Sequence, residues 1–426
     1  MFSRQCIYAA MLVCLAQTGS VVYADNNQPI TSDLQLKRWL ITNVNNHPSV
    51  LAVQASVDAS AYRLVAADKA IYNPELELDA ETAETDSAYI GISQSIDWGD
   101  TRGARTAMAS SEKAAAQFEY ESIRRGIAVE LLTGLSEYHT TAALKQLSQQ
   151  ASTLLKRFSD VASQRFEAGD LSQVEVDLAS LSYAEVRFRR ANAITSNAKA
   201  RQNLIALTGK TDQSWPDIGV SLPDPSSKKL DTEAVVRELP EMRQVTSMVA
   251  AAQAKIKLRT GEAAADPTFS IRAGKEEEEG LFGLTFSVPL QIRNNFRAEI
   301  DVANAEMIEA EREAIDIYRK LKSRLEAARV AYELSREAWL AWESTGEGSL
   351  KHHIELLERL WNAGELSTTD YLVQLTQALE TRASAIEQRG QMWTNWSEWL
   401  VATGQIESWL QTGAAVSYTH LTLPTN

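Results

Sequence analysis

Residues 168–172 read Ala-Gly-Asp-Leu-Ser, and residues 363–367 read Ala-Gly-Glu-Leu-Ser. In both places forty residues separate the motif glycine from a second glycine, Gly169 from Gly209 and Gly364 from Gly404. The two copies lie nearly two hundred residues apart along the chain. Solenoid repeats are about 20–50 residues long, so this spacing predicts a protein made of two similar halves instead.

The pattern in each half predicts a helix, two strands and two further helices, in that order. We expect the domains to be a first repeat over 25–209, a linker over 210–230 and a second repeat over 231–410. Apolar periodicity predicts a helical segment over about 34–69 and long helical stretches over about 101–166 and 295–361. At 1.5 Å per residue each long stretch would reach about 100 Å. Gly346 and Gly348 predict an irregularity in the second one.

The two repeated motifs are typical of helix ends. Gly169 and Gly364 can adopt the left-handed conformation that closes a helix C-terminus. Ser172 and Ser367 are each followed three residues later by an acid, which is the pattern of a capping box. Each motif is therefore the predicted tip of a long helical hairpin.

Four segments alternate with period two, which predicts two β-hairpins with one apolar face. They cover about 75–81, 89–96, 269–273 and 282–290. The polar face of the first segment consists of four acids: Glu75, Glu77, Asp79 and Glu81. The acidic run at 276–279 is expected to form a solvated loop between the last two strands.

Four strands cannot close a barrel, and open strand edges cannot face lipid because their backbone polar groups would be unpaired. Three copies would supply twelve strands, an even number within the range of outer-membrane barrels. The predicted fold class is an α+β membrane protein: a trimeric outer-membrane β-barrel with four strands per chain, continued by a long periplasmic α-helical barrel and built from two internal repeats.

The ends of the chain differ from the rest. Residues 1–24 have the charged start, apolar run and small-residue end of a signal peptide, and they contain both cysteines of the sequence. The tail over 411–426 loses the helical pattern, and we expect it to be partly artefactual.

Composition and motifs exclude several classes of function. The net charge of −14 argues against a nucleic-acid partner. The sequence has no P-loop, no HExxH motif and no nucleophile paired with a base, so we expect no enzyme, no catalytic residue and no cofactor. His352 and His353 lack the spacing of a metal site, and we expect no bound metal.

The hairpin tips, the duplicated halves and the strand end at 287–290 (Ser-Val-Pro-Leu) resemble the outer-membrane efflux proteins, the TolC-like family. Residues 73–76 and 91–96 are more similar to the CzcC-type subgroup that serves heavy-metal RND pumps, whereas residues 98–102 depart from its Gly-Gly-Lys-Arg run. The resemblance implies a homotrimer in outer-membrane lipid that extends into the periplasm. It also implies a periplasmic adaptor (membrane fusion) protein and an inner-membrane RND pump as partners.

In this family an acidic ring narrows the periplasmic end. The resemblance places Asp370 at a matching position, six residues after Gly364, with Glu175 as its counterpart and Asp177 close by. The alternative is that Glu175 and Asp370 only cap helices, where an acid also suits the helix dipole. The acids of the first strand are expected to face the lumen, where they would favour cations.

The sequence therefore predicts a passive exit duct of a tripartite efflux system, with heavy-metal cations as the candidate cargo. One alternative is the duct of a drug efflux or type I secretion system. Another, from a different class, is a periplasmic coiled-coil adaptor without a pore. Such an adaptor would not need apolar residues alternating on four strands.

Overall fold

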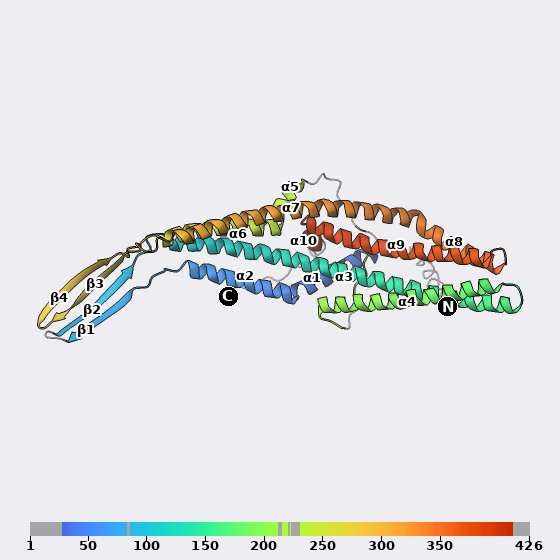
Figure 1. The fold of residues 1–426 in the computed structure, drawn as a ribbon, viewed down its shortest axis with the longest axis horizontal. Helices are drawn as coiled ribbons and strands as arrows, with labels where there is room; N and C mark the ends of the chain where they lie inside the picture. Colours follow the sequence, from blue (N-terminus) through green and yellow to red (C-terminus); the bar gives the residue numbers. More distant parts are fainter. Residues whose placement is uncertain (1–27, 83–85, 212–214, 220–221, 223–230, 412–426) are drawn as a thin grey trace, which may run out of the picture.

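The computed structural model describes residues 28–82, 86–211, 215–219, 222 and 231–411. The signal peptide expected over 1–24 and residues 412–426 of the tail lie outside the described residues. The described part is long and narrow (Figure 1). A β-sheet lies at one end, and the two helical turns that contain Gly169 and Gly364 lie at the other.

The elements follow the predicted order of helix, two strands and helices in both halves. The helices are α1 (Gln28–Asn45), α2 (Pro48–Ala67), α3 (Thr101–Glu167), α4 (Gln173–Thr208), α5 (Thr232–Glu238), α6 (Pro240–Glu262), α7 (Arg297–Ala341), the π-helical turn η1 (Trp342–Gly346), α8 (Glu347–Asn362), α9 (Thr368–Ala402) and α10 (Ile406–Gln411). The strands are β1 (Glu75–Thr82), β2 (Asp86–Ser95), β3 (Thr268–Glu276) and β4 (Glu279–Ser287).

The single helical segment expected over 34–69 is in fact two helices, α1 and α2. Pro48 begins α2 because its ring suits the first helical position and lacks the N–H that a continuing helix would need. His47 caps the new helix by accepting a hydrogen bond from the Ser49 amide at 3.2 Å. Pro240 likewise begins α6, although no side chain caps that helix.

The strands form one antiparallel sheet in the order β1-β2-β3-β4. The loop expected over 276–279 is shorter, because Glu276 pairs with Glu279 across the ladder. Only Glu277 and Glu278 form the turn, and Glu277 adopts a positive φ of 55° that makes this tight connection possible. The outer two acids of the run therefore belong to the strands.

The first long helix is continuous, whereas the second is interrupted. α3 has 67 residues, which corresponds to about 100 Å. The irregularity expected near Gly346 and Gly348 is present as the π-helical turn η1 between α7 and α8. A Cβ atom at residue 346 would collide with the indole ring of Trp342, so glycine is the residue that this turn accommodates.

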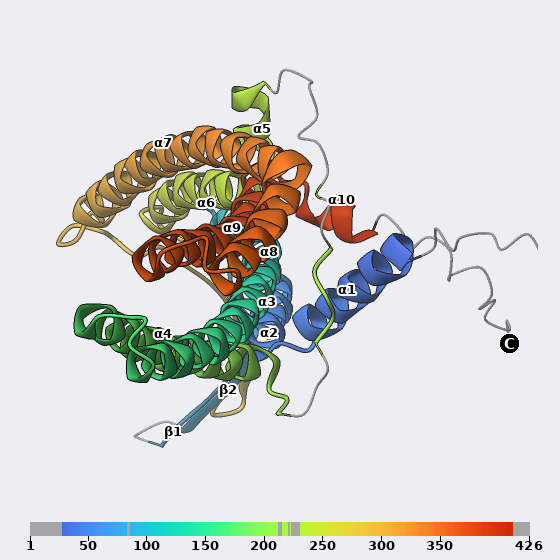
Figure 2. The same ribbon diagram turned by 90° about the vertical axis from the view of Figure 1, so that its right-hand side faces the viewer.

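The largest core lies where most helices overlap. Trp393, Trp396 and Trp399 of α9 are almost completely buried there, against α1, α3, α7 and α10. Trp396 meets Trp409 edge-on with ring centroids 4.8 Å apart. In the end-on view the long helices form an arc that is open on one side, and α1 and α10 lie on its outer side (Figure 2). This core fixes the lateral spacing of the long helices.

A second core lies near the hairpin tips. Phe158 of α3, Trp361 of α8 and Tyr371 of α9 form one aromatic cluster, with ring centroids 4.7 to 5.1 Å apart. The guanidinium of Arg165 lies 4.7 Å from the centroid of the Trp361 ring. The two hairpins are therefore packed together close to their ends, although they are far apart in sequence.

Side-chain contacts also fix the junction between sheet and helices. The Arg105 guanidinium donates to the carbonyls of Ala67 and Lys69 at 3.1 and 2.8 Å, where α2 ends. Tyr72 donates to the carboxylate of Asp266 at 2.7 Å, which links the segment before β1 to the segment before β3. These hydrogen bonds help to hold the sheet in its orientation relative to α2 and α3.

Candidate functional site: the strand sheet and the hairpin tips

One face of the sheet is apolar and exposed along its whole width. Leu76, Ile92, Ile271 and Leu284 lie opposite one another across the four strands. Leu78, Phe282 and Leu284 are 73%, 70% and 72% exposed. We call this the apolar sheet face; its large residues are Leu76, Leu78, Ile90, Ile92, Phe269, Ile271, Phe282, Leu284 and Phe286. A contiguous patch of this size in water marks a surface that contacts lipid or protein.

The opposite face carries the predicted lumen acids. Glu75, Glu77, Asp79 and Glu81 are all exposed on β1. The register adds Glu276 and Glu279, because Glu81 lies opposite Ser87, which lies opposite Glu276. We call these six acids the acidic sheet face. The acidic run predicted a loop at Glu276 and Glu279, although the period-two alternation of β3 continues to Glu276 and places it on this face.

One cation shares the acidic sheet face and was also missed. Arg272 lies opposite Gly91, and Gly91 lies opposite Glu77. Its guanidinium lies 5.5 Å from the centroid of the Tyr89 ring. The absence of a side chain at Gly91 and Gly283 leaves space on both sides of Arg272. The face is therefore mainly, though not purely, negative.

The outer strands of the sheet, β1 and β4, each pair on one side only within the described chain. Their free edges present backbone N–H and C=O groups that a further strand could use. Because the sheet has four alternating strands, β4 of one copy and β1 of another would run antiparallel.

Both predicted tips have the expected backbone geometry. Gly169 and Gly364 have φ values of 85° and 77°, which L-amino acids with side chains adopt at a cost. In the first tip the amide of Asp170 donates to the carbonyl of Arg165 at 2.8 Å, and in the second Glu365 donates to Leu360 at 2.9 Å. These bonds satisfy helix-end carbonyls in the manner of a Schellman motif.

Ser172 begins α4 with the predicted capping box. Its hydroxyl accepts from the Glu175 amide at 3.4 Å, and the Glu175 carboxylate accepts from the Ser172 amide at 2.9 Å. Ser367 begins α9 in a similar way, since its hydroxyl accepts from the Asp370 amide at 3.1 Å and donates to the Asp370 carboxylate at 2.7 Å. Glu175 thus completes a capping box, as the alternative interpretation expected, whereas the Asp370 carboxylate supports its helix cap only through the Ser367 hydroxyl.

The electrostatics of the first tip favour an ionised Glu175. The backbone amide of Ser172, then its hydroxyl, and then the side chain of Thr368 hold the pKa of this carboxyl below its usual range. Thr368 belongs to the second tip, so part of this pKa effect comes from the other hairpin. Asp177 accepts from the side-chain amide of Gln173 at 2.8 Å one turn further along α4. The tip acids and the β1 acids lie at opposite ends of the molecule (Figure 1).

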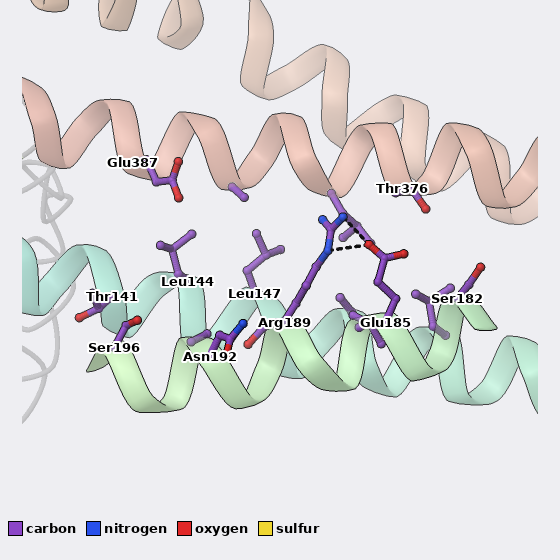
Figure 3. A pocket seen from close by; sticks show the side chains of 17 residues that line it. Thr141, Leu144, Leu147, Ser182, Glu185, Arg189, Asn192, Ser196, Thr376 and Glu387 are labelled. Carbon is purple, nitrogen blue, oxygen red and sulfur yellow. Dashed lines mark hydrogen bonds and ion pairs between the residues drawn. The ribbon is translucent and has the colours of Figure 1, made fainter. Parts of the chain in front are cut away.

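A cavity of about 320 Å³ lies between α3, α4 and α9 (Figure 3), several helical turns away from the tips along these helices. At its side Arg189 of α4 pairs with Glu185 at 2.7 Å and with Glu380 of α9 at 2.8 Å. The spacing of four residues could have predicted the pair with Glu185. Glu380 comes from the other half of the chain, and no local pattern brings it to Arg189.

Among the described helices, none combines the length and apolar character needed to cross a membrane. The described residues also contain no group of three His, Cys, Asp or Glu side chains arranged to hold a metal ion.

Comparisons with known proteins agree with this geometry. The family model described as Outer membrane efflux protein matches residues 42–210. No curated protein matches the sequence. Among solved structures, the Campylobacter jejuni CmeC outer membrane channel is similar over 91% of this chain and 88% of its own, with 14% identity and a TM-score of 0.71. The fold is that of an outer-membrane channel.

Two further channels support the same conclusion. The open state of the Neisseria gonorrhoeae MtrE outer membrane channel is similar over 87% of this chain and 89% of its own, with 14% identity and a TM-score of 0.71. The outer-membrane channel OprN is similar over 89% and 92%, with 13% identity and a TM-score of 0.72. The matched family and these structures are channels, which confirms the expectation that the chain is not an enzyme.

Proposed function

We propose that this chain is the outer-membrane duct of a tripartite efflux system and serves as a passive exit across the periplasm and outer membrane. The observation that carries the proposal is the sheet at the end of the helical body. Its apolar sheet face is exposed, its acidic sheet face is opposite, and both outer strands have a free edge. Lipid on one side and water on the other would satisfy both faces.

Assembly as a homotrimer follows from the strand count. Three copies would pair β4 of one chain with β1 of the next and close twelve strands, leaving no free edge in lipid. The helices already form an arc in one chain (Figure 2), and three such arcs would continue the barrel toward the periplasm. A rival function as an adaptor without a pore would leave the apolar sheet face without a partner.

The hairpin tips would meet a periplasmic adaptor and an inner-membrane RND pump. Both tips lie at the end remote from the sheet. The buried aromatic cluster holds them side by side, so that one partner could contact both. In a trimer, Glu175, Asp177 and Asp370 would be repeated around the narrow end. Their negative charge would attract cations to a gate at this end, in addition to the capping role of Glu175.

The candidate cargo is a heavy-metal cation. The acidic sheet face has six acids and one cation, Arg272. Its negative charge would line the pore near its outer end. The drug efflux and type I secretion alternatives require no such lining. The metal proposal therefore predicts cation selectivity, whereas the duct proposal itself predicts only conductance.

Conductance and selectivity can be measured together in planar bilayers. The purified protein should form trimers by light scattering and should pass cations in preference to anions in a salt gradient. Asp370→Asn with Glu175→Gln should reduce block by divalent ions at the tip end, and Glu75→Gln with Glu77→Gln should reduce selectivity. A stable monomer without conductance would contradict the duct. A conducting trimer whose ion selectivity and divalent block are unchanged in both double variants would contradict only the cation assignments.

A further inference from the structure

A second cavity lies between the two hairpins, at the level of the π-helical turn. Its volume is about 350 Å³, and α3, α7, η1, α8 and α9 all contribute to its lining. Ile218, from the described segment 215–219, also lines it. That segment runs on the outer side of the helical arc, the side of α1 and α10 (Figure 2). The cavity is thus distinct from the two sheet faces and from the tips.

The irregular backbone of η1 shapes this cavity. Trp342 begins the π-helical turn and lines the cavity together with Trp339 of the preceding turn. Gly346 leaves the space that the ring of Trp342 occupies, since any Cβ atom there would collide with it. π-Helical turns are rare, and those that occur inside α-helices are frequently at functional sites. Here the turn places two indole rings on one wall of a cavity.

Two residues that line this cavity each have a buried hydrogen-bond donor without an acceptor. The indole N–H of Trp339 and the Nε–H of Arg389 have no partner within the described residues. A terminal nitrogen of Arg389 donates to the carbonyl of Ile218 at 3.0 Å, which holds the guanidinium in place. Leaving a buried donor unpaired costs about 1–3 kcal/mol. Both unpaired groups are donors, so a molecule that satisfies them must offer acceptor atoms.

The charged groups around the cavity favour an anion. Arg382 and Arg389 of α9 and Lys351 of α8 line it, and Glu347 is the one carboxylate among its lining residues. His139 is already engaged, because its Nε2 lies 2.8 Å from the carbonyl of Pro216. Much of the remaining lining is aliphatic, including Leu147, Leu350 and Ile354. The lining therefore combines apolar walls with an excess of cations.

We propose that this cavity is a binding site for a small organic anion with an apolar or aromatic body, such as an aromatic carboxylate or sulfonate. The two indoles would contact the body of the ligand. The Trp339 N–H and the Arg389 Nε–H, which are buried here, would turn toward its acidic group and donate to it. The volume lies within the range of small-molecule sites, which are mostly apolar with a few placed polar groups. The site is separate from the acidic sheet face, along which the cargo is proposed to pass.

Calorimetric titration with naphthalene-2-sulfonate tests the site on the full chain in lipid nanodiscs, with empty nanodiscs as the blank. Wild-type protein should bind the sulfonate, and 2-naphthalenemethanol, which has the same rings but no charge, should bind at least about tenfold more weakly. Trp339→Phe keeps an aromatic ring but removes the N–H, and Arg389→Gln removes the charge. Each should weaken sulfonate binding by about tenfold.

Trp361→Phe is the matched control, because Trp361 also has a buried, unpaired indole N–H but lies in the aromatic cluster near the tips. It should leave sulfonate affinity unchanged. Ala385→Leu, which adds volume at the cavity wall, should weaken the sulfonate and the neutral analogue alike. The proposal is overturned by absence of binding to wild-type protein, by equal affinity for the neutral analogue, or by equal effects of Trp339→Phe and Trp361→Phe. Conductance of the same samples reports separately on the duct.

Discussion

Phe158 of α3 stacks on Tyr371 of α9, with ring centroids 5.0 Å apart and ring planes only 19° from parallel. The pair joins the hairpin of the first half to the hairpin of the second, and Trp361 covers both rings. Burial, and to a lesser extent the charge of Glu358, raises the pKa of Tyr371 to about 12. The two hairpins therefore share one apolar core near their tips. Moving one tip away from the other would disturb this core.

Removing the Tyr371 ring should loosen the tips. Tyr371→Ala is expected to cost about 3–5 kcal/mol, by analogy with other large-to-small changes of buried aromatic residues. Tyr371→Phe keeps the stacked ring and should cost far less. Hydrogen exchange of the amides in 160–180 and 360–375 should accelerate in the alanine variant alone. Equal exchange in both variants would show that the stack does not hold the hairpins together.

The glycines at the tips should be sensitive to any side chain. Gly364→Ala should destabilise the second tip by about 1–2 kcal/mol, because residue 364 has a φ of 77°. Gly348→Ala is the matched control, since residue 348 is helical with open space at the Cβ position and alanine favours helix there. Thermal unfolding should separate the two variants, and similar melting temperatures would contradict the assigned turn geometry.

The first capping box should weaken in acid. Because the folded pKa of Glu175 is depressed, its contribution is present above the ordinary carboxyl pKa and is lost as the pH falls through the depressed value. Amide exchange at residues 172–176, corrected for its intrinsic pH dependence, should therefore rise below about pH 4. Glu175→Gln should abolish this change. If the glutamine variant retained the same pH dependence, another group would be responsible.

The apolar sheet face should not tolerate a charged side chain. Phe286 is 61% exposed and lies opposite Phe269, with ring centroids 4.9 Å apart. In lipid, Phe286→Arg should cost about 2–4 kcal/mol near the bilayer midplane and reduce the amount of assembled protein in outer membranes. Thr285→Arg places the same charge on the opposite face of β4 and should be milder. Equal assembly of both variants would contradict the proposed orientation of the sheet.

Features that depend on a few adjacent residues were predictable from the sequence. The turns at Gly169 and Gly364, the caps at Ser172 and Ser367, and the irregularity near Gly346 each follow from a local rule about glycine or serine. The alternation of apolar and polar residues likewise predicted the apolar sheet face without knowledge of which strands pair.

Features that depend on distant parts of the chain could not be predicted in this way. Arg189 meets Glu380 only because α4 and α9 are brought side by side. The run at 276–279 was assigned to a loop because four acids are typical of solvated segments, yet its outer members extend the ladder. The split between α1 and α2 was missed, although Pro48 was visible, because the apolar periodicity continues on both sides of it.

The central claim is that β1 separates a lipid-facing side from a water-filled lumen, and its most direct test is chemical modification of an open channel. Residues 25–426 contain no cysteine, so Asp79→Cys and Leu78→Cys each provide a single thiol in that part of the chain. The account predicts that an anionic, water-soluble methanethiosulfonate lowers the single-channel conductance of Asp79→Cys in one step per copy and leaves Leu78→Cys unchanged. Block of Leu78→Cys with no effect on Asp79→Cys, or no channel from either protein, would contradict it.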